Sequence, residues 1–291
     1  MNKKNISILN IMLLVILLIY TLSMVMLLLW GVSTSLKSVD EFRLNVIGLP
    51  KTFEFGNFPF VLNYFYVPIL TSEGFRKYVG LSELLLNTLL YAGGCAFLAT
   101  LTPCIVAYLT AKFHYRFSKI VYSLVLITMI LPIVGSFPSE IQLLTKLGIY
   151  DKIYSPWIQK TNFLGMFYLV FYATFKGISK EYTEAAYVDG ASEMKILTRI
   201  MLPLVKNAFL VIMLIKFIEF WNDYQSPLLY IPSYPTLAFG IYYLSRSSNN
   251  NLSNVPMRMA GCIMLITPIL ILFIIFRNKL IGNLSMGGVK G

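Results

Sequence analysis

The feature that most limits how this chain can fold is an uncharged, almost entirely apolar run over residues 8–31. A helix needs roughly 20 mostly apolar residues to cross a bilayer. Further apolar runs cover residues 82–111, 120–137, 162–176, 207–230 and 255–276. Composition agrees, because 57% of the residues are hydrophobic and 13% are charged, whereas soluble domains have about 45–50% and about 25%. The sequence predicts an all-α, polytopic membrane protein with six transmembrane helices in a single domain, residues 1–291.

Two lysines, Lys3 and Lys4, precede the first apolar run, as they would in a secretory signal peptide. The run is longer than the apolar core of a signal peptide, and no small-residue cleavage pattern follows it. We therefore expect residues 8–31 to remain in the protein as a membrane anchor.

The distribution of basic residues predicts the orientation in the cell membrane. With six crossings, both termini lie on the same side as residues 111–119 and 176–206. Lysine and arginine are about twice as dense on that side as on the other, and such an excess marks cytoplasmic loops. The termini are therefore expected to be cytoplasmic. The outer segment, residues 32–81, is too rich in Phe and Tyr for a disordered chain, so we expect a loop with a short helix.

Charge and composition exclude several classes of function. The net charge is +11, but the basic residues are scattered between apolar blocks, so membrane lipid rather than nucleic acid is the expected partner. Three cysteines within apolar runs and one histidine make neither a disulfide framework nor a metal site. No phosphate-binding G-x-x-x-x-G-K-S/T motif and no catalytic triad or carboxylate pair is present. We expect no enzyme activity and no cofactor bound by this chain.

Residues 177–206 differ from the rest because four of the thirteen acidic residues gather there among basic ones. Helix-forming residues occupy 180–188, and Gly190 can adopt the left-handed conformation that ends a helix. Ser192 could cap a second helix over residues 193–202. Its apolar face would carry Met194, Leu197 and Met201, and Pro203 fits the first turn of the next helix. By physics alone, this segment could be an amphipathic helix pair at the membrane surface.

The motifs in this segment resemble the EAA loop of ABC-importer permease subunits. The matching blocks are Glu184-Ala185-Ala186, Asp189-Gly190-Ala191 and Leu202-Pro203, whereas Lys206 stands where many members have a second proline. The resemblance implies that the segment is a cytoplasmic coupling helix that docks in a cleft of a separate ATPase. Glu184 would then make polar contact with the ATPase, and Ala185, Ala186 and Ala191 would allow close packing in its cleft. Asp189 would either pair with the ATPase or accept from nearby backbone N–H groups.

Other blocks resemble the carbohydrate-uptake branch of that family, which includes MalG-like permeases. They are residues 284–291, Trp221-Asn222-Asp223-Tyr224 with Pro227-Leu228, Asn87-Thr88 and Ala107-Tyr108. The resemblance implies half of a translocation pore for a sugar or oligosaccharide. The implied partners are a second, MalF-like permease, an ATPase dimer that binds ATP and Mg²⁺, and an extracytoplasmic sugar-binding protein.

Ionisable residues within a membrane span indicate function or pairing. Lys216, Glu219 and Asp223 are spaced to share one helix face, beside Trp221 and Asn222. They either form a structural pair between helices or line the sugar path. An intramembrane glycosyl- or acyl-transferase and a stand-alone secondary transporter are the alternative functions, and the latter would favour inverted repeats.

Overall fold

The computed structural model describes residues 8–70, 75–113, 115–131, 135–246 and 254–284. The protein is mostly helical and divides into two compact units, residues 1–65 with 241–268 and residues 66–240 with 269–291. The C-terminal block expected to resemble sugar permeases lies almost wholly outside the described residues, as do Lys3 and Lys4.

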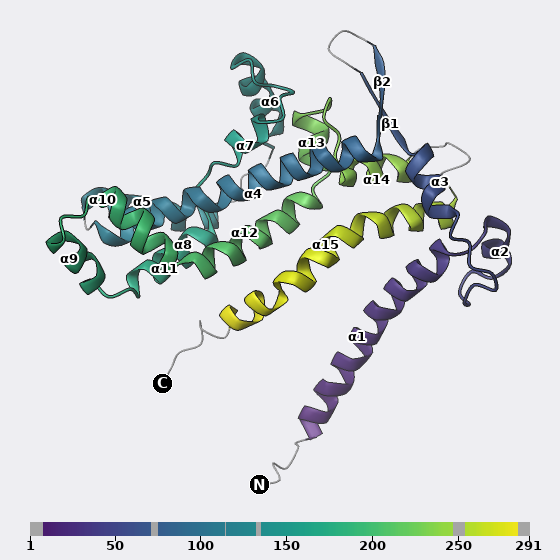
Figure 1. Cartoon of the computed structure of the whole chain (residues 1–291), viewed down its shortest axis with the longest axis horizontal. Helices are drawn as coiled ribbons and strands as arrows, with labels where there is room; N and C mark the ends of the chain where they lie inside the picture. Colours follow the sequence, from purple (N-terminus) through teal and green to yellow (C-terminus); the bar gives the residue numbers. More distant parts are fainter. Residues whose placement is uncertain (1–7, 71–74, 114, 132–134, 247–253, 285–291) are drawn as a thin grey trace. The chain divides into compact units, whose positions relative to one another are not determined.

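In the first unit, α1 (Ile8–Ser35) is a single long helix that is exposed along nearly its whole length (Figure 1). Two short helices follow in the outer segment, α2 (Val39–Leu44) and α3 (Asn57–Tyr64). Ser38 caps α2 by accepting from the N–H of Glu41. The outer segment therefore contains the expected helix, in two pieces.

A fully buried lysine fixes this outer segment. Lys37 Nζ donates to the carbonyl of Asn45 over 2.7 Å, at the C-terminal end of α2. Asn57 Nδ2 donates to the carbonyls of Ser35 and Lys37 over 2.8 and 2.9 Å. A cation at a helix C-terminus interacts favourably with the partial negative charge of the last carbonyls. These contacts join the end of α1 to the C-terminal end of α2 and to the start of α3.

The second unit begins with an antiparallel hairpin of β1 (Tyr66–Leu70) and β2 (Arg76–Gly80), in which Val67 faces Val79. The expectation of an all-α fold is therefore wrong in one respect, because the outer segment contains a strand pair besides the expected loop and short helix. Both valines are fully buried, which gives the hairpin the apolar face that a strand pair requires. The remaining helices of this unit are α4 (Leu81–Lys112), α5 (Arg116–Ile130), α6 (Phe137–Lys146), α7 (Ser155–Gln159), α8 (Met166–Lys176), α9 (Glu181–Val188), α10 (Glu193–Ile196), α11 (Leu202–Leu204), α12 (Lys206–Trp221) and α13 (Gln225–Tyr230).

Helix α4 is the axis of the second unit, with α12 and α8 packed along it (Figure 1). Small buried side chains face these neighbours and allow the backbones to approach closely: Ala92, Cys95, Ala96, Ala99, Cys104 and Ala107. At one end of α4, its buried residues join a cluster that includes Phe171, Ile196 and Met201. Two more helices, α14 (Leu237–Arg246) and α15 (Val255–Leu284), complete the chain.

Most predicted spans coincide with a helix, but not every helix is long enough to cross a membrane. Among the described residues, α1 and α4 alone meet the length and hydropathy expected of a span. A third span results if α10–α11 and α12 are counted together, although they are bent by 73°. The predicted span 207–230 is interrupted because α12 ends at Trp221. Six membrane crossings therefore stay a prediction.

Candidate functional site

Most residues singled out in the sequence fall into two regions of the second unit. The first, which we call the elbow, consists of residues 181–204 and includes α9, α10, the π-helical turn η1 (Leu197–Met201) and α11. The second, which we call the polar cavity, lies between α4, α6, α12 and the segment that precedes α8.

Gly190 makes the turn of the elbow, as its position in the sequence predicts. Its φ is +73°, and the N–H of Ala191 donates to the carbonyl of Ala186 over 2.9 Å, which closes the C-terminus of α9. A Cβ at Gly190 would have no atom within 4 Å. The turn therefore requires glycine for its backbone conformation and not for space.

The residues that resemble the EAA motif divide between two faces of the elbow. Glu184, Ala185 and Asp189 are exposed, and the Asp189 carboxylate makes no hydrogen bond or ion pair with any described residue. Ala186 is only 7% exposed and packs in this chain's own core, with Ala191 partly buried against it. The expectation that Ala186 packs in a partner's cleft is therefore wrong, because α9 turns that alanine towards α4 and α8.

The second limb of the elbow departs from the expected regular helix. After α10 the backbone widens into η1, and the N–H of Leu202 donates to the carbonyl of Leu197, five residues earlier. The widened turn rotates the buried face, so Ile196 and Met201 are buried while Met194 is 68% exposed. The predicted apolar face is therefore wrong for Met194, whereas Met201 is buried and Leu197 packs partly buried against the same core cluster. Ser192 has the extended conformation of a capping residue, but its side chain caps nothing.

A lysine from outside the elbow joins its two limbs. Lys112, the last residue of α4, donates from Nζ to Tyr187 Oη over 2.9 Å and to Glu193 Oε2 over 3.0 Å. The Tyr187 hydroxyl in turn donates to Glu193. No sequence pattern indicates this network, since Tyr187 and Glu193 lie 75 and 81 positions after Lys112.

A hollow of about 500 Å³ opens beside this network, between the ends of α4 and α8 and the first limb of the elbow. Lysine and hydroxyl side chains dominate its polar surface. They are Lys112, Lys176, Lys180, Ser179, Thr183, Tyr108 and Tyr187.

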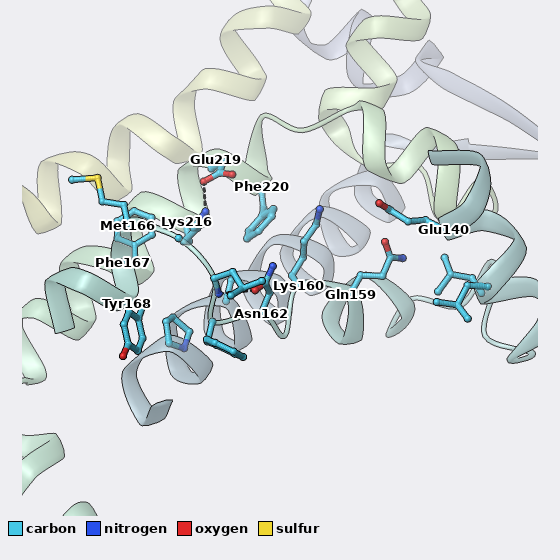
Figure 2. A pocket seen from close by; sticks show the side chains of 17 residues that line it. Glu140, Gln159, Lys160, Asn162, Met166, Phe167, Tyr168, Lys216, Glu219 and Phe220 are labelled. Atoms are coloured by element: carbon cyan, nitrogen blue, oxygen red, sulfur yellow. Dashed lines mark hydrogen bonds and ion pairs between the residues drawn. The ribbon is translucent and has the colours of Figure 1, made fainter. Parts of the chain in front are cut away.

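The polar cavity has a volume of about 610 Å³, and Figure 2 shows the side chains around it. Helix α4 contributes Ala99 and Pro103, and α12 contributes Lys216, Glu219 and Phe220. The polar side chains on the opposite side are Glu140, Gln159, Lys160 and Asn162, none of which the sequence singled out. The one sequence feature that could have identified them is their polarity within the predicted outer loop 138–161 and at the start of the following span.

Two lysines in the polar cavity lie near the same aromatic ring. Lys216 Nζ pairs with Glu219 Oε2 over 2.8 Å and lies 5.1 Å from the ring centre of Phe167. It also lies 5.8 Å from the ring centre of Phe220, and Lys160 Nζ is 5.9 Å from that centre. Cations near an aromatic face are attracted by the ring quadrupole. The pair predicted within span five is therefore present and opens on a cavity.

Trp221, Asn222 and Asp223 are placed elsewhere, because α12 ends before Asp223 can share the face of Lys216 and Glu219. Trp221 is buried, and Asn222 donates to the carbonyl of Ile218. Asp223 accepts from Tyr91 Oη over 2.7 Å and from two N–H groups at the start of α13. The predicted shared face is wrong for Asp223, and none of the three residues lines the polar cavity.

Three contacts anchor the α6–α7 segment that forms one side of the polar cavity. Trp157 Nε1 donates to the carbonyl of Leu90 over 3.0 Å, and the Trp157 ring covers Gly94, where a Cβ would lie 2.2 Å from it. Asp151 accepts from the hydroxyl and N–H of Ser233. Glu140 accepts from Tyr230. Hydrogen bonds from Ser136 and Tyr230 lower the pKa of Glu140, so its carboxylate is charged near neutral pH.

Comparison with known families gives one family match. Residues 99–281 match the family described as binding-protein-dependent transport system inner membrane component. This range includes the elbow and most of the polar cavity.

Curated proteins with similar sequences carry names of sugar transport systems. The chain is 32% identical over 199 residues to the arabinooligosaccharides transport system permease protein AraQ of Halalkalibacterium halodurans, which is 67% of this chain and 69% of that protein. It is 25% identical over 261 residues to the melibiose/raffinose/stachyose import permease protein MelC of Bacillus subtilis, which is 89% of each.

A solved structure has the same fold. It is the crystal structure of a bacterial ABC transporter involved in the import of the acidic polysaccharide alginate, with a TM-score of 0.76 and 22% sequence identity. The match covers 96% of this chain and 98% of that one.

Proposed function

The chain belongs to the family of binding-protein-dependent transport system inner membrane components, and from this premise we propose that it forms half of the translocation pore of an ATP-driven sugar importer. The names of its relatives support a sugar or oligosaccharide as the cargo. A permease of this family is a transport subunit integral to the cytoplasmic membrane, which argues against the enzyme and the stand-alone transporter.

The elbow is the site where we place coupling to a separate ATPase. The observation that carries this proposal is a glycine turn that presents Ala185 and Asp189 to solvent while Ala186 and Ile196 anchor the same segment in the core. Val188, at 89% exposed, adds an apolar side chain to the exposed face. An anchored helix with small and apolar residues on its free face suits insertion into a cleft of another protein.

The polar cavity is our candidate for part of the sugar path. Its charged pair lies beside two phenylalanine rings, and its other polar groups can donate to and accept from hydroxyls: Glu140, Gln159, Lys160 and Asn162. Small-molecule sites combine apolar walls with a few placed polar groups in this way. Trp221, Asn222 and Asp223 would then support the cavity from outside it.

The complete importer needs partners that this chain does not include. We propose a second permease, an ATPase dimer that binds ATP and Mg²⁺, and an extracytoplasmic sugar-binding protein. Six membrane crossings with cytoplasmic termini would place the elbow on the same side as the ATPase, in agreement with the basic residues around it.

The test is to replace exposed elbow residues in the reconstituted complex. Ala185→Trp should prevent the helix from seating, since overpacking a tight contact costs about 1–3 kcal/mol. Sugar uptake and binding-protein-stimulated ATP hydrolysis should then fall together. The matched control is Ala173→Trp, the same exchange at an exposed alanine of α8 outside the elbow. Wild-type uptake and stimulated hydrolysis in Ala185→Trp would contradict the coupling role.

A further inference from the structure

Lys112 has an unusual position for a lysine at the end of a long helix. Its side chain is only 16% exposed, and Nζ donates to three acceptors, which are Tyr108 Oη, Tyr187 Oη and Glu193 Oε2. An ammonium has three N–H donors, so all three are used. Nζ also lies 4.8 Å from the ring centre of Tyr187. The Lys112 ammonium is therefore held in one position, whereas most lysines at the end of a helix extend into water.

Two of the three acceptors belong to different limbs of the elbow. Tyr187 lies in α9 before the Gly190 turn, and Glu193 opens α10 after it. Because Tyr187 also donates to Glu193, the three side chains form a closed set of contacts. The Lys112 ammonium, which belongs to neither limb, thus holds the two limbs at a fixed spacing.

The elbow is continuous in sequence with α8 and α12, whereas among the described residues its hydrogen bonds to α4 come from side chains. Apolar contacts are present there, since Ala186, Ile196 and Met201 pack in the same cluster as Ala107 and Tyr108. Apolar contacts are not directional and allow sliding, whereas three hydrogen bonds to one ammonium fix the position. Lys112 supplies this directional link.

Helix α4 connects that link to the polar cavity. Pro103 lines the cavity and lies nine positions before Lys112, which corresponds to about 13 Å along a helix. The other wall, on α12, is joined to the elbow through the chain itself. Both walls of the polar cavity are therefore connected to the elbow, one by the backbone and one by Lys112.

We propose that Lys112 is a positioning residue for coupling, which makes α4 move together with the elbow when the ATPase moves it. This inference rests on the proposed function, in which the elbow contacts the ATPase. Without Lys112, the elbow still docks and α12 still moves, but α4 no longer follows, so ATP hydrolysis is separated from sugar movement.

The experiment compares sugar transported per ATP hydrolysed in reconstituted complexes that contain every subunit. Lys112→Met keeps the aliphatic stem and removes the three donors, and we expect the ratio to fall about tenfold, as the loss of charged hydrogen bonds of this kind implies. Lys112→Arg, which keeps charge and donors, should restore most of it. The control is Lys176→Met, since Lys176 Nζ lies 5.5 Å from the ring centre of Tyr172 and forms no salt bridge with a described residue.

Two further variants keep the proposal falsifiable if Lys112→Met assembles poorly. Tyr187→Phe removes one hydroxyl, and Glu193→Gln removes the charge. Each should lower the ratio, and adding Glu193→Gln to Lys112→Met should lower it little further, because residues in one network act non-additively. A wild-type ratio in Tyr187→Phe and Glu193→Gln overturns the proposal. If Ala185→Trp still lowers sugar uptake and stimulated ATP hydrolysis together in that case, the elbow keeps its role; if it does not, the proposed function fails as well.

Discussion

One lysine–glutamate pair beside aromatic rings lines the polar cavity within a single helix, and another joins α4 to the elbow. Lys216 and Glu219 are three positions apart on one helix, with 2.8 Å between Nζ and Oε2. Lys112 and Glu193 are 81 positions apart, at 3.0 Å, and join α4 to the elbow. A pair within one helix can open without loosening any contact between elements. The pair at the elbow cannot, so the first suits a binding surface and the second suits a joint.

The largest effect should come from separating the cavity wall from α4 while the elbow stays intact. In Gly94→Ala the new methyl group would displace the Trp157 ring and break its hydrogen bond to Leu90. We expect the free energy of unfolding to fall by about 2–3 kcal/mol, with loss of sugar transport. Denaturant titration in detergent and uptake into proteoliposomes measure both.

Gly93 provides a matched control for that variant, because a Cβ there would meet no atom within 4 Å. Gly93→Ala should leave stability unchanged or raise it, since alanine is favoured over glycine in a helix by about 1 kcal/mol. Equal effects of the two exchanges would show that the Trp157 ring does not anchor the cavity wall.

The next largest effect tests whether the elbow pair is a joint. Lys112→Met should lower the free energy of unfolding by about 1–2 kcal/mol, because Tyr187 and Glu193 lose a charged donor. For a chain of this size the midpoint of thermal unfolding should drop by about 2–8 °C. An unchanged midpoint would show that the Lys112–Glu193 pair contributes no more to stability than the Lys216–Glu219 pair in the cavity.

A comparable effect distinguishes the contribution of the elbow's backbone turn from that of its side-chain contacts. Gly190→Ala adds one methyl group in open space, so its cost comes only from the positive φ and should be about 1–2 kcal/mol. The Lys112 contacts should persist, and stability should be measured together with the ratio of sugar to ATP. A stabilised Gly190→Ala protein would mean that the turn does not hold the left-handed conformation.

The smallest effect on stability should come from the cavity pair. Lys216→Met should change the free energy of unfolding by only about 0.5 kcal/mol or less, as for other pairs within a helix. Its effect should instead appear in transport, as a higher sugar concentration at half-maximal uptake. If Lys216→Met costs as much stability as Lys112→Met, the contrast between the two pairs is wrong.

The difference between the pairs also explains what the sequence could predict. The helical spacing of Lys216 and Glu219 was sufficient to predict that they pair. The position of Gly190 between two helix-forming segments was sufficient to predict the turn. Neither kind of local signal reaches from Lys112 to Glu193, since their proximity depends on how α4 packs against the elbow. The residues around the polar cavity from 140 to 162 were missed for the same reason.

Some local features were also not predicted. The strand over Tyr66–Leu70 contains Pro68, which argues against a strand in an isolated sequence. The end of α12 at Trp221 interrupts an apolar run predicted as one helix, and the π-helical turn at Leu197–Met201 interrupts the predicted amphipathic helix 193–202. In each case the backbone conformation depends on tertiary packing and not on the hydropathy of the segment.

The second limb of the elbow, Glu193–Leu204, meets α12 at a bend of 73°. A rotation of the elbow about this bend would therefore displace the far end of α12. Phe220, at the cavity, lies 14 positions beyond the start of α12 at Lys206, a distance of about 21 Å along the helix axis. A rotation of about 10° at the bend would move that end of α12 by about 3.7 Å, a displacement larger than a typical donor–acceptor distance. Under the proposed function, a small angular displacement of the elbow would therefore shift Lys216 and Glu219 by about 3 Å relative to a bound sugar.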